Sequence, residues 1–197
     1  DLTVDTPLVY HQQFEETAPV DRDETNVETQ AITLRHEIRK LFLVSDNEAF
    51  NRLYEFVGQD RLNESMARAG LPKARIVHRL AEARSAEENR LTPRIDFSSD
   101  NGVLFSLPSI LSQPLPEIPP IVGLNVGKGY VSGDARIDHP MDFAPKNRVS
   151  LRDLQKGLCK LVRPDVDCGD DGAFGLSAVD RALLLQSMGQ FPRESAN

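Results

Sequence analysis

Three segments come close to known chemical motifs, and each lacks an essential residue. Residues 36–40 (His-Glu-Ile-Arg-Lys) begin like the zinc-protease helix, but lysine stands where the second zinc-binding histidine is needed. The glycines of residues 127–133 resemble a dinucleotide-binding loop whose last glycine comes one place late. The aspartates of residues 165–171 suggest calcium, but Leu176 stands where the loop needs its final carboxylate. We therefore predict no metal site and no cofactor.

The most informative polar residues are Ser45, Asp46 and Asn47, which stand between two predicted helices. They offer a hydroxyl, a carboxylate and an amide, which can donate and accept several hydrogen bonds. A structural role is also open, because Ser45 and Glu48 have the spacing of a capping box and Asp46 or Asn47 could serve in the turn. The same triplet recurs at residues 99–101, in a predicted hairpin loop. The three residues alone therefore do not decide between function and structure.

Three short helices are predicted around this triplet. The first begins after the capping residue Thr33, the second runs from Glu48 to Gly58, and the third ends at Gly70. The helical spacing of their apolar residues predicts these inward-facing side chains: Leu34, Ile38, Leu41 and Phe42, then Ala49, Phe50, Leu53 and Val57, then Leu62, Met66 and Ala69.

The second half of the chain combines extended, irregular and helical patterns. A hairpin is predicted around residues 99–102, because Asn-Gly accommodates positive φ. Five prolines and then a run of glycines make residues 108–133 a predicted irregular, surface-exposed insertion. Two further helices are predicted to start at Ser150 and Ser177. Their predicted buried residues are Leu151, Leu154, Leu158 and Leu161, then Val179, Leu183 and Met188.

Length and composition suit a chain with a real core. The 197 residues carry 30 acidic and 23 basic side chains, and the net charge of -7 argues against nucleic acid or an anionic membrane as a partner. No apolar run is long enough to span a membrane. The predicted fold class is α+β and mainly helical, with residues 1–30 as an arm or long loop and residues 31–197 as a helical region. Cys159 and Cys168 fit either one disulfide or two free thiols.

Residues 41–53 (Leu-Phe-Leu-Val-Ser-Asp-Asn-Glu-Ala-Phe-Asn-Arg-Leu) resemble the second conserved element of the penicillin-recognising serine hydrolases. This superfamily includes class A β-lactamases and D,D-peptidases. A closer likeness to a bacterial β-lactamase-like branch is carried by residues 45–58, 87–92, 127–134, 141–154 and 191–195. The resemblance covers most of the chain from about Ala31 onward, and it implies the helical domain of a β-lactamase-like fold.

The resemblance also implies an activity and a set of site residues. Such enzymes cleave an amide or β-lactam bond through an acyl-serine intermediate. Ser45 would relay a proton towards the leaving nitrogen, Asn47 would hold the carbonyl of a β-lactam or peptidoglycan-like substrate, and Asp46 would brace the turn. Glu88, or else Glu87, would position the deacylating water, although the usual Glu-x-x-x-Asn pattern is absent. The implied location is periplasmic or secreted.

Two elements of that superfamily do not occur in the sequence: there is no Ser-x-x-Lys and no Lys-Ser-Gly or Lys-Thr-Gly. In the family these elements lie before and after the region that the chain resembles. We therefore expect a central fragment of a longer enzyme, inactive as it stands. Two alternatives stay open: a non-catalytic binding module that keeps the fold, and an unrelated helical interaction domain that shares only capping chemistry. The sequence leaves the oligomeric state open.

Overall fold

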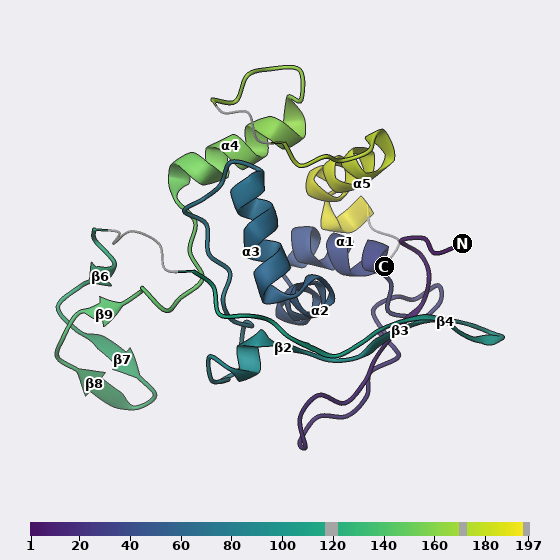
Figure 1. The fold of residues 1–197 in the computed structure, drawn as a ribbon, viewed down its shortest axis with the longest axis horizontal. Coiled ribbons are helices and arrows are strands. Elements are labelled where there is room, and N and C mark those ends of the chain that lie inside the picture. Colours follow the sequence, from purple (N-terminus) through teal and green to yellow (C-terminus); the bar gives the residue numbers. More distant parts are fainter. Residues whose placement is uncertain (117–121, 170–172, 195–197) are drawn as a thin grey trace.

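The structure, a computed structural model, describes residues 1–116, 122–169 and 173–194, and its architecture is α+β (Figure 1). The α-helices are α1 (Leu34–Val44), α2 (Asn47–Val57), α3 (Gln59–Arg68), α4 (Leu151–Val162) and α5 (Ala178–Gly189), and the 3-10 turns are η1 (Glu88–Arg90) and η2 (Pro192–Glu194). The strands are β1 (Leu8–Tyr10), β2 (Leu91–Thr92), β3 (Ile95–Ser99), β4 (Gly102–Leu107), β5 (Ile110–Leu111), β6 (Asn125–Val126), β7 (Tyr130–Ser132), β8 (Ala135–Ile137) and β9 (Met141–Asp142). No described helix has the length and apolar character required to cross a bilayer.

The hydrophobic core lies on a three-stranded antiparallel sheet in the order β1-β3-β4. Leu8 pairs with Phe97 and Tyr10 with Ile95, and these four side chains are buried together with Ile32. Residues 1–30 are therefore more than an arm, because β1 supplies two core residues from a segment that otherwise lacks long regular elements. A strand of three residues is too short to show periodicity, so the sequence did not indicate it.

The three predicted helices around the Ser-Asp-Asn triplet are present as α1, α2 and α3. Thr33 caps α1, since its side chain accepts a hydrogen bond of 3.2 Å from the backbone N–H of His36. The predicted burial is only partly right: Ala49 and Ala69 are buried, whereas Phe42 is 43% exposed. The buried side of α1 is polar and consists of His36, Glu37 and Lys40. These side chains form ion pairs inside the protein, and the spacing of apolar residues along the helix does not predict such pairs.

The predicted starts of α4 and α5 are confirmed. Of the side chains predicted to be buried on these helices, Leu161 and Leu183 are half-buried, and the prediction is wrong for the rest. The Ser150 hydroxyl accepts from the N–H of Asp153 at 3.0 Å, and the Ser177 hydroxyl accepts from the N–H of Asp180 at 3.1 Å. Leu151 is 86% exposed and Val179 is 78% exposed. Leu154, Leu158 and Met188 are exposed as well. Capping depends on neighbours in the chain, whereas burial depends on which element packs against the helix, and no described element covers these side chains.

The hairpin is confirmed as β3 and β4, which flank a turn that ends at Gly102 with φ of 115°. Residues 108–133 contain only short strands in their described part, and residues 117–121 lie outside it. The β6–β9 and β7–β8 pairs lie to one side, away from the helices (Figure 1). Ser112 is an exception to the predicted exposure, since it is buried and its hydroxyl donates to Asp60 at 3.0 Å.

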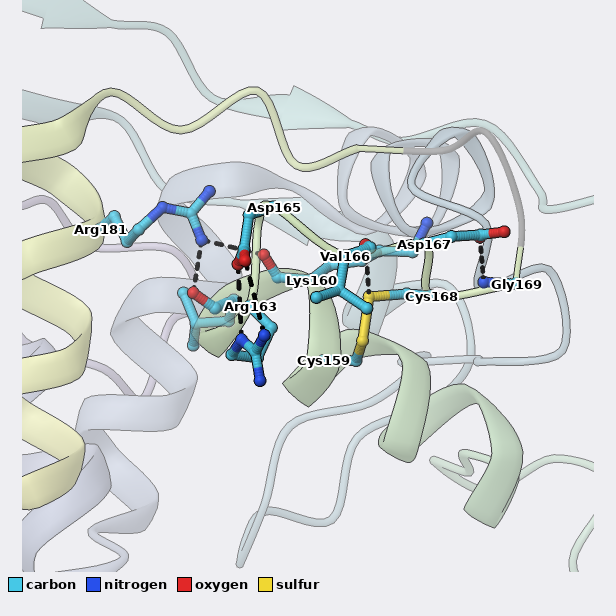
Figure 2. The surroundings of a disulfide bond; sticks show 10 residues. Cys159, Lys160, Arg163, Asp165, Val166, Asp167, Cys168, Gly169 and Arg181 are labelled. Atoms are coloured by element: carbon cyan, nitrogen blue, oxygen red, sulfur yellow. Dashed lines mark hydrogen bonds and ion pairs between the residues drawn. A yellow bond between two sulfur atoms is a disulfide. The ribbon is translucent and has the colours of Figure 1, made fainter.

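A disulfide joins Cys159, on α4, to Cys168 in the loop that follows (Figure 2). Of the two alternatives that the sequence left open, the structure therefore has the disulfide. The C-terminal end of α4 is held to α5, because Arg181 donates to the carbonyl oxygen of Lys160 at 2.9 Å. In turn α5 packs against α1 (Figure 1), so the C-terminal helices are tied to the helical block.

Candidate functional site

The turn between α1 and α2 is formed by Ser45 and Asp46. Ser45 ends α1 in the left-handed region, with φ of 55° and ψ of 45°. Asp46 caps α2, because its carboxylate accepts from the N–H of Ala49 at 2.8 Å. Lys40 of α1 lies 3.6 Å from the other oxygen of Asp46. The capping role that Ser45 and Glu48 shared in one sequence interpretation therefore belongs to Asp46.

The side chains of Ser45 and Asn47 are exposed on either side of Asp46. Within the described residues neither of them makes a side-chain hydrogen bond. Their hydroxyl and amide groups are therefore available to a ligand. A left-handed backbone costs a non-glycine residue about 1–2 kcal/mol, so the packing of α1 against α2 must hold Ser45 in place.

Asn51 joins the same helix to a distant loop. Its side-chain oxygen accepts from the N–H of Leu80 at 2.8 Å, and its NH2 donates to the carbonyl of Leu80 at 2.9 Å and to the Glu82 carboxylate at 3.1 Å. Asn51 follows Asn47 by one helical turn, so both lie on one face of α2. Ala81, between the two loop residues, also has positive φ, 57°. The fold therefore brings the carboxylate of Glu82 to the face of α2 that carries Asn47.

The interactions of Glu88 are local. Its carboxylate accepts from the N–H of Ser85 at 2.7 Å, and its own N–H donates to the Ser85 hydroxyl at 3.2 Å, a reciprocal capping box at η1. These hydrogen bonds lower the pKa of Glu88. No interaction in the described part joins Glu88 to Ser45 or Asn47, and Glu87 is exposed. Glu82 was not among the predicted site residues. Its only signal in the sequence is its partner Asn51, which lies one helical turn after Asn47.

Two hollows flank the Ser-Asp-Asn turn. Asp46, Lys40 and Val44 line the first. The second, of about 230 Å³, lies against the N-terminal segment and is lined by Glu48, Asn51 and Glu82 among others. Ser45 and Asn47 themselves line neither hollow. Their position beside the hollows is compatible with a small ligand, and their exposure also fits an interaction surface.

Beneath the turn, a buried charged cluster ties α1, α2 and the N-terminal segment together. Asp23 accepts from Lys40 at 2.7 Å and from Arg52 at 2.9 Å, and Arg52 also donates to Glu37 at 3.2 Å. Burial alone would raise the pKa of Asp23, but hydrogen bonds from Lys40 and Thr25 outweigh it and lower the pKa. Burial raises the pKa of Glu37 to about 7, against the opposing charges of Arg52 and Lys40.

The described residues contain no cluster of side chains that could bind a metal ion. No group of three or more His, Cys, Asp or Glu side chains there could hold a metal ion. Residues 170 and 171 of the calcium-like run lie outside the described residues.

Residues 1–96 match the model of the β-lactamase enzyme family, Beta-lactamase2. The resemblance to β-lactamase-like serine hydrolases is thereby confirmed for this part of the chain, which includes the turn, Asn51, Glu82 and Glu88. The match supports a hydrolase at the level of the family. No curated protein and no solved structure matched the chain.

The matched range differs from the expected one at both ends. It includes residues 1–30, which the sequence analysis placed outside the resemblance, and it stops before the stretches at residues 127–134, 141–154 and 191–195. The position of β1 in the core agrees with the inclusion of the N-terminal segment. The likeness of the later stretches stays a prediction.

Proposed function

We propose that this chain carries the helical side of the substrate site of a serine hydrolase that cleaves an amide or β-lactam bond through an acyl-serine intermediate. Asn47 would donate its side-chain N–H to the substrate carbonyl, and Ser45 would relay a proton to the leaving nitrogen. Glu82, in preference to Glu88, would position the water that attacks the acyl group. The substrate would be a small β-lactam or a peptidoglycan-like amide.

The observation that supports this proposal best is the set of hydrogen bonds between the Asn51 side chain and residues 80–82. Three hydrogen bonds hold this loop against α2, at distances of 2.8, 2.9 and 3.1 Å. Both Ser45 and Ala81 have backbones in the left-handed region. Such strained residues persist only where the surrounding structure holds them, and they cluster at active sites. The family match supports a hydrolase as the class of protein.

No residue of the chain is assigned as the nucleophile, because Ser-x-x-Lys does not occur in its sequence. We therefore expect the chain to bind substrate analogues without being acylated. Benzylpenicillin and N-acetyl-D-alanyl-D-alanine are suitable probes, since they present the β-lactam and the peptidoglycan-like amide. Their addition to the isotope-labelled chain should produce saturable NMR shifts at Ser45, at the side-chain amide of Asn47 and at Glu82.

The variant Asn47→Ala tests the proposed carbonyl contact. It should weaken binding of the probes by about tenfold or more, because it removes a hydrogen bond to the ligand. The matched control is Asn101→Ala, which alters the same Ser-Asp-Asn triplet in the turn between β3 and β4 and should leave binding unchanged. Glu82→Gln should alter the NMR response of the site more than Glu88→Gln does.

Two results would contradict the proposal. A serine of this chain found acylated by mass spectrometry would show that the nucleophile lies within it. If the probes cause no saturable NMR shifts at Ser45 and Asn47, these residues do not form a substrate site.

The second candidate function, a non-catalytic interaction module, is favoured by the exposed positions of Ser45 and Asn47 outside both hollows. Flanking coding sequence that contains Ser-x-x-Lys upstream and a Lys-x-Gly strand downstream would exclude it. We also propose a periplasmic or secreted location. The Cys159–Cys168 disulfide supports it, because such bonds persist in oxidising compartments.

A further inference from the structure

A basic pocket lies between the segment that follows α3 and the segment that precedes α4. Its volume is about 1050 Å³. The cationic residues that line it are Arg75, Arg79, Arg84, Arg90, Lys146 and Arg148, and the carboxylate is Glu82. This local excess of positive charge stands out in a chain whose net charge is -7.

Carboxylates neutralise only part of this charge. Arg79 pairs with Glu55 at 2.7 Å, and Arg84 pairs with Glu82 at 3.2 Å. Within the described residues, Arg75 and Arg148 form no ion pair. Each donates to a backbone carbonyl, Arg75 to Pro116 at 3.0 Å and Arg148 to Ala144.

Arg75 and Arg148 stand directly opposite each other. Their backbones form an antiparallel bridge in which each N–H donates to the other residue's carbonyl at 2.8 Å. Paired residues of such a bridge project their side chains to the same side, and like charges there destabilise the fold. Burial, followed by the charge of Arg148, lowers the pKa of Arg75. Arg75 is only 8% exposed, and the Nε of Arg148 is buried with no partner in the described part of the chain.

The two segments are held rigidly together. The side-chain oxygen of Asn147 accepts from the N–H groups of Val77 and His78, at 2.7 and 3.0 Å, and its NH2 donates to the His78 carbonyl at 2.8 Å. The like-charged pair is therefore built into a stiff part of the fold. Preorganised donors of this kind lower the entropic cost of binding a ligand.

We propose that the basic pocket binds an organic anion, with the guanidinium groups of Arg75 and Arg148 as donors to its carboxylate or phosphate group. Guanidinium groups match both anions with parallel hydrogen bonds. The remaining walls include Val77, Leu80, Leu115 and Pro145, which suit an apolar body attached to the charged group. An anion would offset the repulsion between the two arginines and give the buried Nε a partner. This site does not depend on the proposed hydrolase function.

Phenyl phosphate, benzoate and inorganic phosphate are the probes that test this site. Calorimetric titration of the full chain at constant ionic strength should show saturable binding of phenyl phosphate or benzoate. If both phosphate probes bind and benzoate does not, the natural ligand is a phosphate, and binding of benzoate indicates a carboxylate. If inorganic phosphate binds more weakly than phenyl phosphate, the apolar walls of the pocket contribute to the affinity.

Arg148→Gln should weaken binding of the best probe by about tenfold or more, since it removes a charge-assisted hydrogen bond. It should also raise the melting temperature of the ligand-free chain, because it removes the like charge beside Arg75. The control is Arg136→Gln, which replaces an exposed arginine on β8 outside the pocket and should leave the affinity unchanged. Arg148→Lys keeps the charge but not the planar fork, and it should also bind more weakly.

The proposal is overturned if none of the three probes binds saturably to the wild-type chain. It is also overturned if Arg148→Lys and Arg148→Gln both bind as tightly as wild type. If Arg148→Gln does not fold, the Lys variant alone decides, because its charge matches that of the native residue.

Discussion

The carboxyl group of Glu37 connects α1 to α2 from a position with no exposure to solvent. One of its oxygens accepts from Arg52, and the other has no hydrogen-bond partner within the described residues. Its pKa of about 7 lies above the ordinary value of 4.5. Between these two pH values the folded chain binds more protons at Glu37 than the unfolded chain does. The contribution of Glu37 to the free energy of unfolding therefore falls as pH rises from 4.5 to 7.

Glu37→Gln should remove this contribution to the pH dependence. The difference in the free energy of unfolding between variant and wild type should change by up to about 3 kcal/mol between pH 4.5 and pH 8, in favour of the variant at high pH. Urea denaturation at several pH values measures it. Burial raises the pKa of Glu55 and lowers that of His36, but both groups remain in the variant, so the difference isolates Glu37. Exposed Glu64→Gln is the control, and parallel pH profiles for wild type and Glu37→Gln would contradict the prediction.

At the scale of single elements, the start of α2 depends on one side chain. Asp46 accepts from the N–H of Ala49, and it also lies beside Lys40 of the preceding helix. Because the acceptor satisfies an otherwise unpaired N–H, it sets where α1 ends and α2 begins. The positions of Ser45 and Asn47 on either side follow from this cap.

Asp46→Ala should lower the free energy of unfolding by about 1 kcal/mol, the usual cost of losing an N-cap. Asp46→Asn, which keeps an acceptor oxygen, should lose less. Asn47→Ala is the neighbouring control and should stay within about 0.5 kcal/mol of wild type, since its side chain is exposed. Thermal denaturation of the three variants gives the comparison. Equal stability of Asp46→Ala and wild type would show that the cap does not stabilise α2.

At the scale of the whole molecule, the apolar residues fall into two classes. Leu8 and Ile95 are almost completely buried in the sheet core, whereas Leu151 and Leu158 on α4 are exposed. The two groups have the same side-chain chemistry, and only the arrangement of the elements separates them. The apolar contribution to stability should therefore come mainly from the β1-β3-β4 core.

Leu8→Ala should lower the free energy of unfolding by about 2–5 kcal/mol, because it leaves a cavity in a closed core. Leu151→Ala should change it by no more than about 0.5 kcal/mol, since its side chain is already in water. Urea denaturation of both variants tests the difference. A loss at Leu151 as large as that at Leu8 would mean that the apolar face of α4 is covered in solution.

Local chemistry accounts for the parts of the fold that could be predicted. The helix starts at Thr33, Ser150 and Ser177 and the turn at Gly102 depend on groups only a few residues apart. The same holds for the Ser45–Asn47 triplet, which could be singled out because its neighbours in sequence carry the resemblance. The Glu82 carboxylate could not be singled out, because it reaches Asn51 through a separation of 31 residues.

The sequence by itself determined where the helices begin, where the hairpin turns and which superfamily the Ser-Asp-Asn segment resembles. These features depend on interactions between residues that are close along the chain. Only the tertiary structure decided that α1 buries charged groups, that Glu82 lies against α2 and that Arg75 faces Arg148. Each of these depends on segments distant in sequence whose contact results from packing of the whole chain. Hydrophobic periodicity marks a face as apolar, but the fold decides whether anything covers it.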